Sequence, residues 1–226
     1  HLIDFLLENN FRPIVYDNRD TGLSSRIPSD SFSDAKRDNT IVKNYIRYYL
    51  RLPIKSDYTL DDMAVDGISV LNKLDISEAH ILGISMGGMI AQIIVSSHPE
   101  RTKTFTLISS TASTPSPFNG PTRKVRKLLM NRTKNPNSTV DERVARSRKI
   151  FTEIGYQGID LNTEEFYNNV AISIERAGKD DTGFGRQLNA ILASQNRLEK
   201  VKSISAPTLI VHGLDDPLIK VKNAYK

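Results

Sequence analysis

The chain has 226 residues, of which 38% are hydrophobic and 25% are charged, a composition that excludes a mainly disordered protein and suits one domain with room for an inserted sub-domain. The longest apolar run, residues 90–95 with Gln92 inside it, is far shorter than the roughly 20 residues that span a bilayer, so no membrane span is expected. Cysteine is absent, which excludes disulfides, thiolate metal sites and cysteine nucleophiles and fits a reducing compartment, so we expect a cytoplasmic protein.

The net charge of +5 is unevenly distributed along the chain. Residues 121–150 contain ten basic and two acidic side chains, so this segment carries +8 and the remainder carries −3. Such a basic block can attract an anionic substrate, a membrane surface or nucleic acid. It also suits the solvated outer face of helices. We favour the second interpretation and expect no nucleic-acid partner.

Four short apolar runs rich in Ile, Leu and Val are typical of buried strands in a parallel sheet. Such strands are covered on both faces and therefore show no polar alternation. The four predicted strands are residues 12–17, 79–83, 105–109 and 208–211.

Two helices are predicted between these strands. Residues 59–74 begin with a capping box of Thr59 and Asp62, and residues 86–97 form an apolar helix that ends before Pro99. The first helix carries an apolar stripe of Leu60, Ala64, Ile68, Leu71 and Leu74. Strands that alternate with helices of this length predict an α/β fold.

Residues 115–198 break this alternation. After a proline-rich exit, helical patterns follow Thr139 and Thr163, and a further one begins at Phe184. A run of helices between two core strands indicates an inserted helical cap. We therefore predict three segments. The first part of the core is at residues 1–114, the cap is at residues 115–198, and the last part of the core that is present is at residues 199–226.

The most specific motif is GISMGG at residues 83–88, a G-x-S-x-G sequence between a predicted strand and a predicted helix. This context is typical of a nucleophile elbow. The serine of an elbow lies in a strained turn, so Gly83 and Gly87 are expected where side chains would collide. Ser85 would be the nucleophile, and the backbone N–H of Met86 would donate to an oxyanion. The alternative is a glycine-rich turn with an incidental serine.

A second motif, HGLDDP at residues 212–217, follows the last predicted strand. It places two adjacent carboxylates, Asp215 and Asp216, where a serine–histidine pair needs its orienting acid. The alternative is an Asp-rich turn before Pro217, which is a frequent loop composition.

Together with YDNRDTGLS at residues 16–24 and YTLDDMAVD at residues 58–66, these motifs resemble the α/β-hydrolase fold superfamily, most closely the esterase group that includes aclacinomycin methylesterase. The resemblance implies a mostly parallel sheet flanked by helices, with an inserted helical cap. It also implies that Asp216, and not Asp215, is the triad acid. Asp20 stands where the wider superfamily usually has glycine, and this feature matches the esterase group better.

The third triad member is not evident. In the resembled family the histidine follows the serine and the acid after one more strand and helix, and the oxyanion loop precedes the part matched here. We therefore expect the histidine beyond Lys226 and the second oxyanion donor before His1, and we interpret the chain as an internal fragment that lacks the first and last strands. His80, His98 and His212 are expected to have structural roles.

The resemblance implies a serine hydrolase of the carboxylesterase or methylesterase type, acting on a small-molecule ester through an acyl-enzyme. No cofactor is implied, and no His, Asp and Glu spacing suggests a metal site. The sequence leaves the oligomeric state open. Two alternatives also stay open: hydrolysis of a C–C bond or an enol-lactone on the same fold, and a non-catalytic hydrolase-like binding protein. Haloalkane dehalogenase is disfavoured, because its nucleophile is a carboxylate and Ser85 stands in that position.

Overall fold

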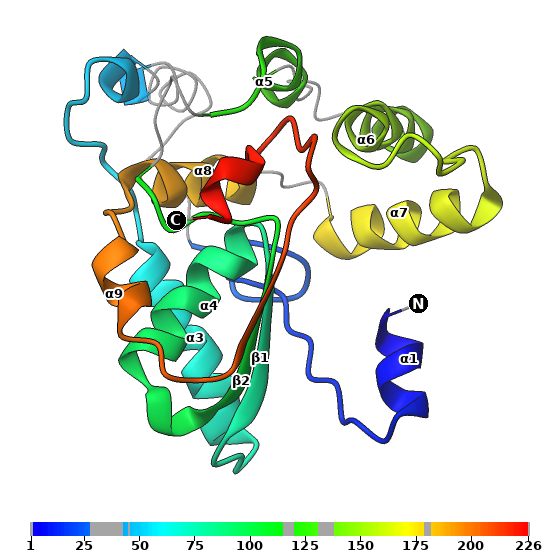
Figure 1. Ribbon diagram of the computed structural model, residues 1–226. Helices are drawn as coiled ribbons and strands as arrows, with labels where there is room; N and C mark the ends of the chain where they lie inside the picture. Colours follow the sequence, from blue (N-terminus) through cyan, green and yellow to red (C-terminus); the bar gives the residue numbers. More distant parts are fainter. Residues whose placement is uncertain are drawn as a thin grey trace.

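The computed structural model describes residues 2–27, 43–44, 46–114, 120–130, 138–178 and 182–225 (Figure 1). In chain order the elements up to the second strand are α1 (Leu2–Glu8), α3 (Leu60–Lys73), β1 (Ala79–Ile84), α4 (Met86–Ser97), η1 (Pro99–Arg101) and β2 (Thr102–Ile108), and the last ones are α9 (Leu198–Lys202), β3 (Thr208–Val211) and η2 (Val221–Asn223). Between β2 and β3 lie α5 (Arg123–Met130), α6 (Val140–Ile154), α7 (Glu164–Ala177) and α8 (Thr182–Ala193).

The three strands form a parallel sheet in the order β1-β2-β3 within the described residues. Ile84 of β1 pairs with Ile108 of β2, which pairs with Val211 of β3. All three strands therefore end at one common edge, and the loops that follow them start side by side. The sheet and its flanking helices confirm the predicted α/β fold. The predicted strands at residues 79–83 and 208–211 match β1 and β3, whereas the strand predicted at residues 105–109 overlaps β2, which begins earlier, at Thr102.

The prediction of a strand at residues 12–17 is wrong. This segment has no ladder hydrogen bonds to a neighbouring strand, and Pro13 has no N–H to donate to one. Side chains attach it to the core instead: Phe11 meets His80 of β1 edge to face, with ring centroids 5.6 Å apart, and the Tyr16 hydroxyl lies so close to Gly67 of α3 that a Cβ there would be 2.8 Å away. An apolar run alone does not make a strand without a paired backbone.

Helix α3 begins as predicted. The Thr59 side chain accepts from the N–H of Asp62, and the Asp62 carboxylate accepts from the N–H of Thr59. The Thr59 hydroxyl also donates to the Asp62 carboxylate at 2.7 Å, and this hydrogen bond, together with the one from the Thr59 N–H, holds the pKa of Asp62 below its usual range. The stripe of α3 is buried except at its end, because Leu74 is the C-terminal cap and is 40% exposed.

Helix α4 lies at the centre of the core. Its residues 88–95 are all buried. One side contributes to a cluster with α3, built around Met63 and Met89, and the other packs against Phe105 of β2 through Ala91 and Val95. This double packing explains why α4 is apolar nearly all round.

Helices α5–α8 lie beyond the common edge at which the strands end (Figure 1). Thr139 caps α6 in a capping box with Glu142, and the Thr163 side chain caps α7 by accepting from the N–H of Phe166. The helices expected from these caps are therefore present. The boundaries of the proposed cap, residues 115–198, stay a prediction, and residues 115–119, 131–137 and 179–181 of it lie outside the described residues.

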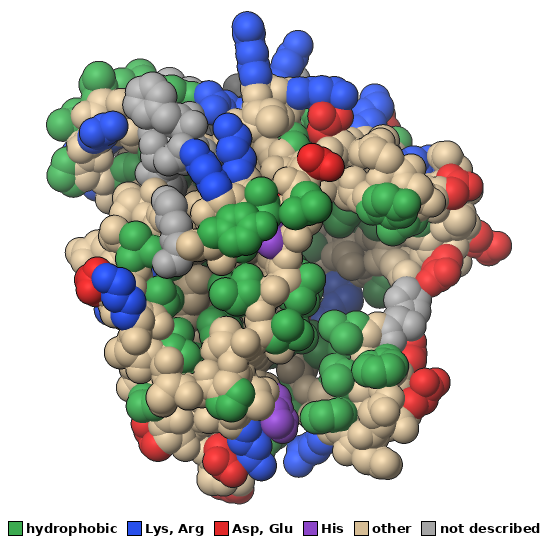
Figure 2. Space-filling model, in the orientation of Figure 1, with side chains coloured by type: hydrophobic (Ala, Val, Ile, Leu, Met, Phe, Trp, Pro, Cys, Tyr) green, Lys and Arg blue, Asp and Glu red, His purple; other side chains and the backbone are tan. Residues whose placement is uncertain are grey.

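Exposed apolar side chains lie across the face drawn in Figure 2, with basic side chains among them. Leu82 and Ile84 of β1 and Leu209 and Val211 of β3 are exposed, so one face of the described sheet is open. Lys and Arg side chains project at the top of Figure 2, in the region of α5 and α6. Within the described ranges, no helix combines the length and the apolar composition that a bilayer crossing needs.

The basic block partly serves to join helices. Arg143 of α6 donates to the carbonyl oxygen of Gly178 at 3.1 Å, and Arg148 donates to that of Leu161 at 3.0 Å while its guanidinium lies over the ring of Phe166. In the described part of residues 121–150, these two arginines thus hold neighbouring backbone, and the interpretation of the block as a solvated helical face stays a prediction.

We expect heparin and anionic vesicles to bind the protein only weakly, because exposed charges on a solvated helical face are screened at moderate ionic strength. Retention on a heparin column and co-sedimentation with vesicles of anionic lipid, each at low and moderate salt, measure this. Tight binding that weakens steeply with salt would show that residues 121–150 recruit anions.

Candidate active site

Ser85 joins the end of β1 to the start of α4 in a strained backbone conformation. Its φ is 52° and its ψ is −117°, a region that residues with a side chain rarely adopt. Its N–H donates to the carbonyl oxygen of Ile108 at 3.0 Å. A serine that caps a helix normally has an extended backbone and uses its hydroxyl as the cap, but the Ser85 side chain makes no capping hydrogen bond to α4. The turn therefore presents the hydroxyl instead of using it to cap the helix.

The glycines of the motif differ in their steric roles. A Cβ on Gly83 would lie 2.4 Å from the carbonyl oxygen of Gly87, and one on Gly88 would lie 2.6 Å from the Cβ of Ser110. A Cβ on Gly87 would meet no described atom within 4 Å. The expected steric demand is thus present at Gly83 but not at Gly87, which enters the close contact through its carbonyl group. Gly88, which the motif does not specify, is the second position that must stay small.

Two further groups hold this turn. Ser110, buried just after β2, donates its hydroxyl to the carbonyl oxygen of Ser85 at 2.7 Å. Met86 is the first residue of α4, so its N–H has no intrahelical acceptor and lies at the positive end of the helix dipole. Ser110 was missed from the sequence, where its only signal is a polar side chain at the carboxyl end of a core strand.

The two predicted carboxylates differ after β3. Asp215 is exposed, whereas the Asp216 side chain is only 13% exposed. Oδ1 of Asp216 accepts from the N–H groups of Leu218 and Ile219, both at 2.8 Å, and Oδ2 lies 3.5 Å from Nε2 of His212. Asp216 is therefore held in place by the backbone of its own loop through Oδ1. Within the described residues, Oδ2 makes only the longer contact with His212.

The histidines of the described chain are occupied elsewhere. Nε2 of His212 lies 2.6 Å from the carbonyl oxygen of Ile219, and since a carbonyl only accepts, this nitrogen carries the proton and donates it. His80 lies at the start of β1, roughly 16 Å from Ser85 along the strand. His98 follows the last residue of α4, roughly 20 Å from Ser85 along the helix axis.

The structure brings Ser85, Met86 and Asp216 to the same edge of the sheet. β1 and β3 lie on either side of β2, which places the strands that carry Ser85 and the Asp216 loop about 10 Å apart. An imidazole that is hydrogen-bonded at both nitrogens spans roughly 7–8 Å between its two oxygen partners. The two loops therefore start from strands whose separation is comparable to this span.

Comparison with known proteins gives the family. A family model described as alpha/beta hydrolase fold matches residues 1–226. The chain belongs to the α/β-hydrolase fold family. The match confirms the resemblance that the motifs indicated.

The relatives of this chain include a methylesterase and a second kind of hydrolase. It is 24% identical to the rhodomycin D methylesterase of Streptomyces peucetius over 219 residues, which cover 90% of this chain and 65% of the relative. It is 28% identical to a 2-hydroxy-6-oxononadienedioate/2-hydroxy-6-oxononatrienedioate hydrolase of a Pseudomonas species over 155 residues, covering 66% and 50% of the two chains. The chain thus spans less than two thirds of the length of these relatives.

A solved hydrolase structure from Pseudomonas aeruginosa superimposes on this α/β hydrolase with a TM-score of 0.64 at 19% identity, covering 100% of this chain and 71% of that one. At this identity the likeness concerns the fold alone. It agrees with the parallel sheet and its flanking helices.

A buried arginine of this α/β hydrolase was also missed from the sequence. Arg197, between α8 and α9, donates to the side-chain oxygen of Gln92 at 3.1 Å and to the carbonyl oxygen of Thr111 at 2.9 Å. Burial lowers its pKa to about 10, against a smaller opposite effect of Asp61. Arg197 therefore ties the end of the inserted helices to α4 and to the loop after β2.

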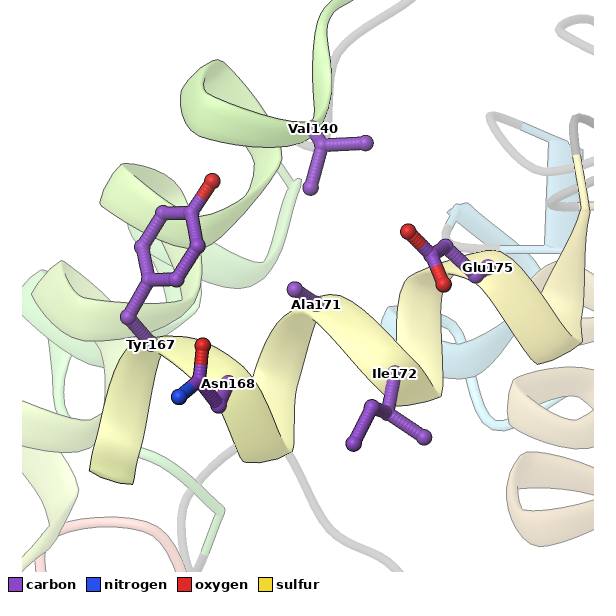
Figure 3. Close-up of a pocket in the computed structure, with 6 residues that line it drawn as sticks. All are labelled: Val140, Tyr167, Asn168, Ala171, Ile172 and Glu175. Carbon is purple, nitrogen blue, oxygen red and sulfur yellow. The ribbon is translucent and has the colours of Figure 1, made fainter. Parts of the chain in front are cut away.

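A hollow of about 470 Å³ lies on the inserted helices (Figure 3). It is lined by Val140, Tyr167, Asn168, Ala171, Ile172 and Glu175. These residues belong to α7 and the start of α6, so Ser85 and Asp216 are not part of it, and we assign it no role in catalysis. In the part of the chain that the structure describes, His, Asp and Glu side chains form no group of three that could hold a metal ion.

Proposed function

We propose that this α/β hydrolase is a serine hydrolase that cleaves small-molecule carboxylic esters through an acyl-enzyme, without a cofactor or a metal ion. The observation that carries the proposal is the backbone of Ser85, at φ 52° between a strand and a helix, with a hydroxyl that does not cap the helix. The similarity to a methylesterase supports an ester as the substrate.

The proposed reaction uses groups at one edge of the sheet. Oγ of Ser85 attacks the acyl carbonyl while a histidine takes its proton, and the Met86 N–H stabilises the oxyanion. Asp216 orients that histidine, which then protonates the departing alkoxide as the C–O bond breaks. Water, deprotonated by the same histidine, hydrolyses the acyl-enzyme and regenerates Ser85. The positions of His80 and His98 and the contact of His212 support a base other than these three histidines.

We further propose that the inserted helices form much of the substrate pocket, as expected of a cap over residues 115–198. Two contacts support this. Ala190 and Ile191 of α8 belong to the same hydrophobic cluster as Met86, and the N–H of Thr122, just before α5, donates to the carbonyl oxygen of Pro217 at 2.9 Å. The insertion thus adjoins both candidate catalytic loops.

The second candidate function is hydrolysis of a C–C bond next to a carbonyl group. It is favoured by the 28% identity to the 2-hydroxy-6-oxononadienedioate/2-hydroxy-6-oxononatrienedioate hydrolase. Both reactions can use a serine elbow, so the geometry of Ser85 does not separate them.

A direct comparison of substrates tests the proposal. We expect the full-length protein to hydrolyse p-nitrophenyl acetate and butyrate with a burst of one p-nitrophenolate per enzyme, the kinetic signature of an acyl-enzyme. A 2-hydroxy-6-oxo-dienoate is expected to be turned over at least about 100-fold less efficiently, a difference of roughly 3 kcal/mol in transition-state stabilisation. The reverse preference would favour the second candidate, and turnover of neither would favour a non-catalytic protein.

A further inference from the structure

Asp20 is a buried carboxylate in a backbone conformation that favours glycine. Its φ is 67°, and its side chain is 0% exposed. Among residues with a side chain, Asp and Asn tolerate this left-handed region best. A residue kept there in place of glycine therefore has a use for its carboxylate.

The Asp20 carboxylate forms a bidentate ion pair with Arg186 of helix α8. Nε of Arg186 donates to Oδ2 of Asp20 and Nη2 donates to Oδ1, both at 2.8 Å. The N–H of Ile27 donates to the same Oδ1 at 2.8 Å. Burial raises the pKa of Asp20, but the hydrogen bonds from Arg186 and Ile27 outweigh burial and hold this pKa below its usual range. Asp20 is thus ionised at neutral pH.

The same face of α8 also contacts the loop that contains Asp20 through Gly183 and Gln187. A Cβ on Gly183 would lie 2.0 Å from the carbonyl oxygen of Asp20, so the absence of a side chain there lets the helix approach. Nε2 of Gln187 donates to the carbonyl oxygen of Arg19 at 2.9 Å and to Oγ1 of Thr21 at 2.7 Å. Positions 183, 186 and 187 lie on one side of a helix.

This side of α8 continues toward the candidate nucleophile. Ala190, two turns after Gly183, is 1% exposed, and with Ile191 it belongs to the hydrophobic cluster that contains Met86 and Met89 of α4. The N-terminal half of α8 is therefore attached to the Asp20 loop, and the C-terminal half packs into the cluster that includes the residue after Ser85.

We propose that the Asp20–Arg186 pair is a positioning pair, which fixes the register and rotation of α8 and thereby the shape of the substrate pocket beside Ser85. The proposal rests on the proposed esterase function. A bidentate arginine–carboxylate pair has a defined plane and direction, whereas an apolar contact of the same size lets a helix slide or rotate. The pair is therefore expected to affect the binding of large substrates more than the chemical step.

The structure offers a matched control on the neighbouring helix. Arg176 of α7 donates to Oδ2 of Asp17 at 2.7 Å, but its side chain is 49% exposed. This second ion pair joins the same loop to the inserted helices at the surface, where ion pairs contribute little. Arg176→Gln removes it without disturbing a buried group.

The test compares two esters with the full-length protein. Asp20→Asn and Arg186→Gln should each lower kcat/KM for p-nitrophenyl hexanoate at least tenfold relative to p-nitrophenyl acetate, mainly through KM, and Arg176→Gln should change this ratio less than twofold. The double variant Asp20→Gly/Arg186→Met leaves no buried charge unpaired and gives the left-handed position a glycine, so it should fold and still lose the discrimination. An unchanged ratio in the folded variants, or an equal loss for both esters, would overturn the proposal.

Hydrogen exchange separates this proposal from the esterase proposal. Amides of α8 should exchange at least tenfold faster in Asp20→Asn than in the unaltered protein, while those of α3 stay protected. If the unaltered protein hydrolyses neither ester, the proposed function fails, but the exchange still reports whether the pair holds α8. If α8 exchange is unchanged, the positioning proposal is wrong even in an active esterase.

Discussion

Replacing Ser85 by alanine is expected to abolish covalent labelling by a fluorophosphonate and to lower ester turnover by roughly 10⁴–10⁶-fold. The reagent reacts with a hydroxyl only where a base and an oxyanion site activate it. Ser85 has the backbone geometry for such activation, because its hydroxyl is not the cap of α4 and its neighbour Met86 carries an N–H without an intrahelical acceptor. Labelling is measured by in-gel fluorescence, and turnover is measured with p-nitrophenyl butyrate.

The matched control is Ser97→Ala at the other end of the same helix. Ser97 is exposed and is the last residue of α4, so its removal tests the loss of a hydroxyl on this helix without touching the elbow. We expect Ser97→Ala to be labelled and to turn over substrate like the unaltered protein. Labelling that persists in Ser85→Ala would show that another serine is activated and that the elbow is a structural turn.

The elements predicted best from the sequence are those whose signals are local. The N-terminal starts of α3, α6 and α7 follow from Thr59, Thr139 and Thr163, because an N-capping side chain accepts a hydrogen bond from backbone within three residues of itself. The elbow is predicted for the same reason, since strand, serine and helix lie within one short segment. Contacts between residues this close in the chain can be predicted from the sequence alone.

The predictions that the structure does not support depend on contacts between segments far apart in the sequence. Residues 12–17 have the composition of a strand, but a strand exists only where another backbone pairs with it, and composition does not report that. The motif suggested that Gly87 avoids a collision, whereas the collisions are at Gly83 and at Gly88, where the neighbour is Ser110. The role of Gly88 depends on how the loop after β2 packs on α4, which lies outside any local pattern.

The buried polar contacts show the same limit more strongly. Arg197 reaches Gln92 across 105 residues of sequence, and Arg186 reaches Asp20 across 166. An isolated arginine in a helical insertion is most often solvated, so no feature near Arg186 marks it as the partner of a buried carboxylate. The unusual residue at position 20 was visible in the sequence, but its partner was not.

Replacing Asp216 by asparagine is expected to lower ester turnover about a thousandfold or more, with a far smaller effect of Asp215→Asn. The carboxylate of a triad holds one tautomer of the histidine and stabilises the imidazolium, and an amide does neither. Asp216 is the better placed of the two, because its side chain is mostly buried at the edge of the sheet that carries Ser85, while Asp215 is exposed.

The structure also gives Asp216 a second role, which the experiment must separate from catalysis. Oδ1 of Asp216 accepts two backbone hydrogen bonds in its own loop, and an asparagine oxygen can accept both. We therefore expect Asp216→Asn to keep a melting temperature within a few degrees of the unaltered protein, since neutral hydrogen bonds of this kind contribute about 1 kcal/mol each. Asp216→Ala removes the acceptor as well, so it should lose activity and also stability. If Asp215→Asn were the inactive variant and Asp216→Asn the active one, the loop after β3 would present the other carboxylate to the histidine, and Asp216 would have the loop-forming role alone.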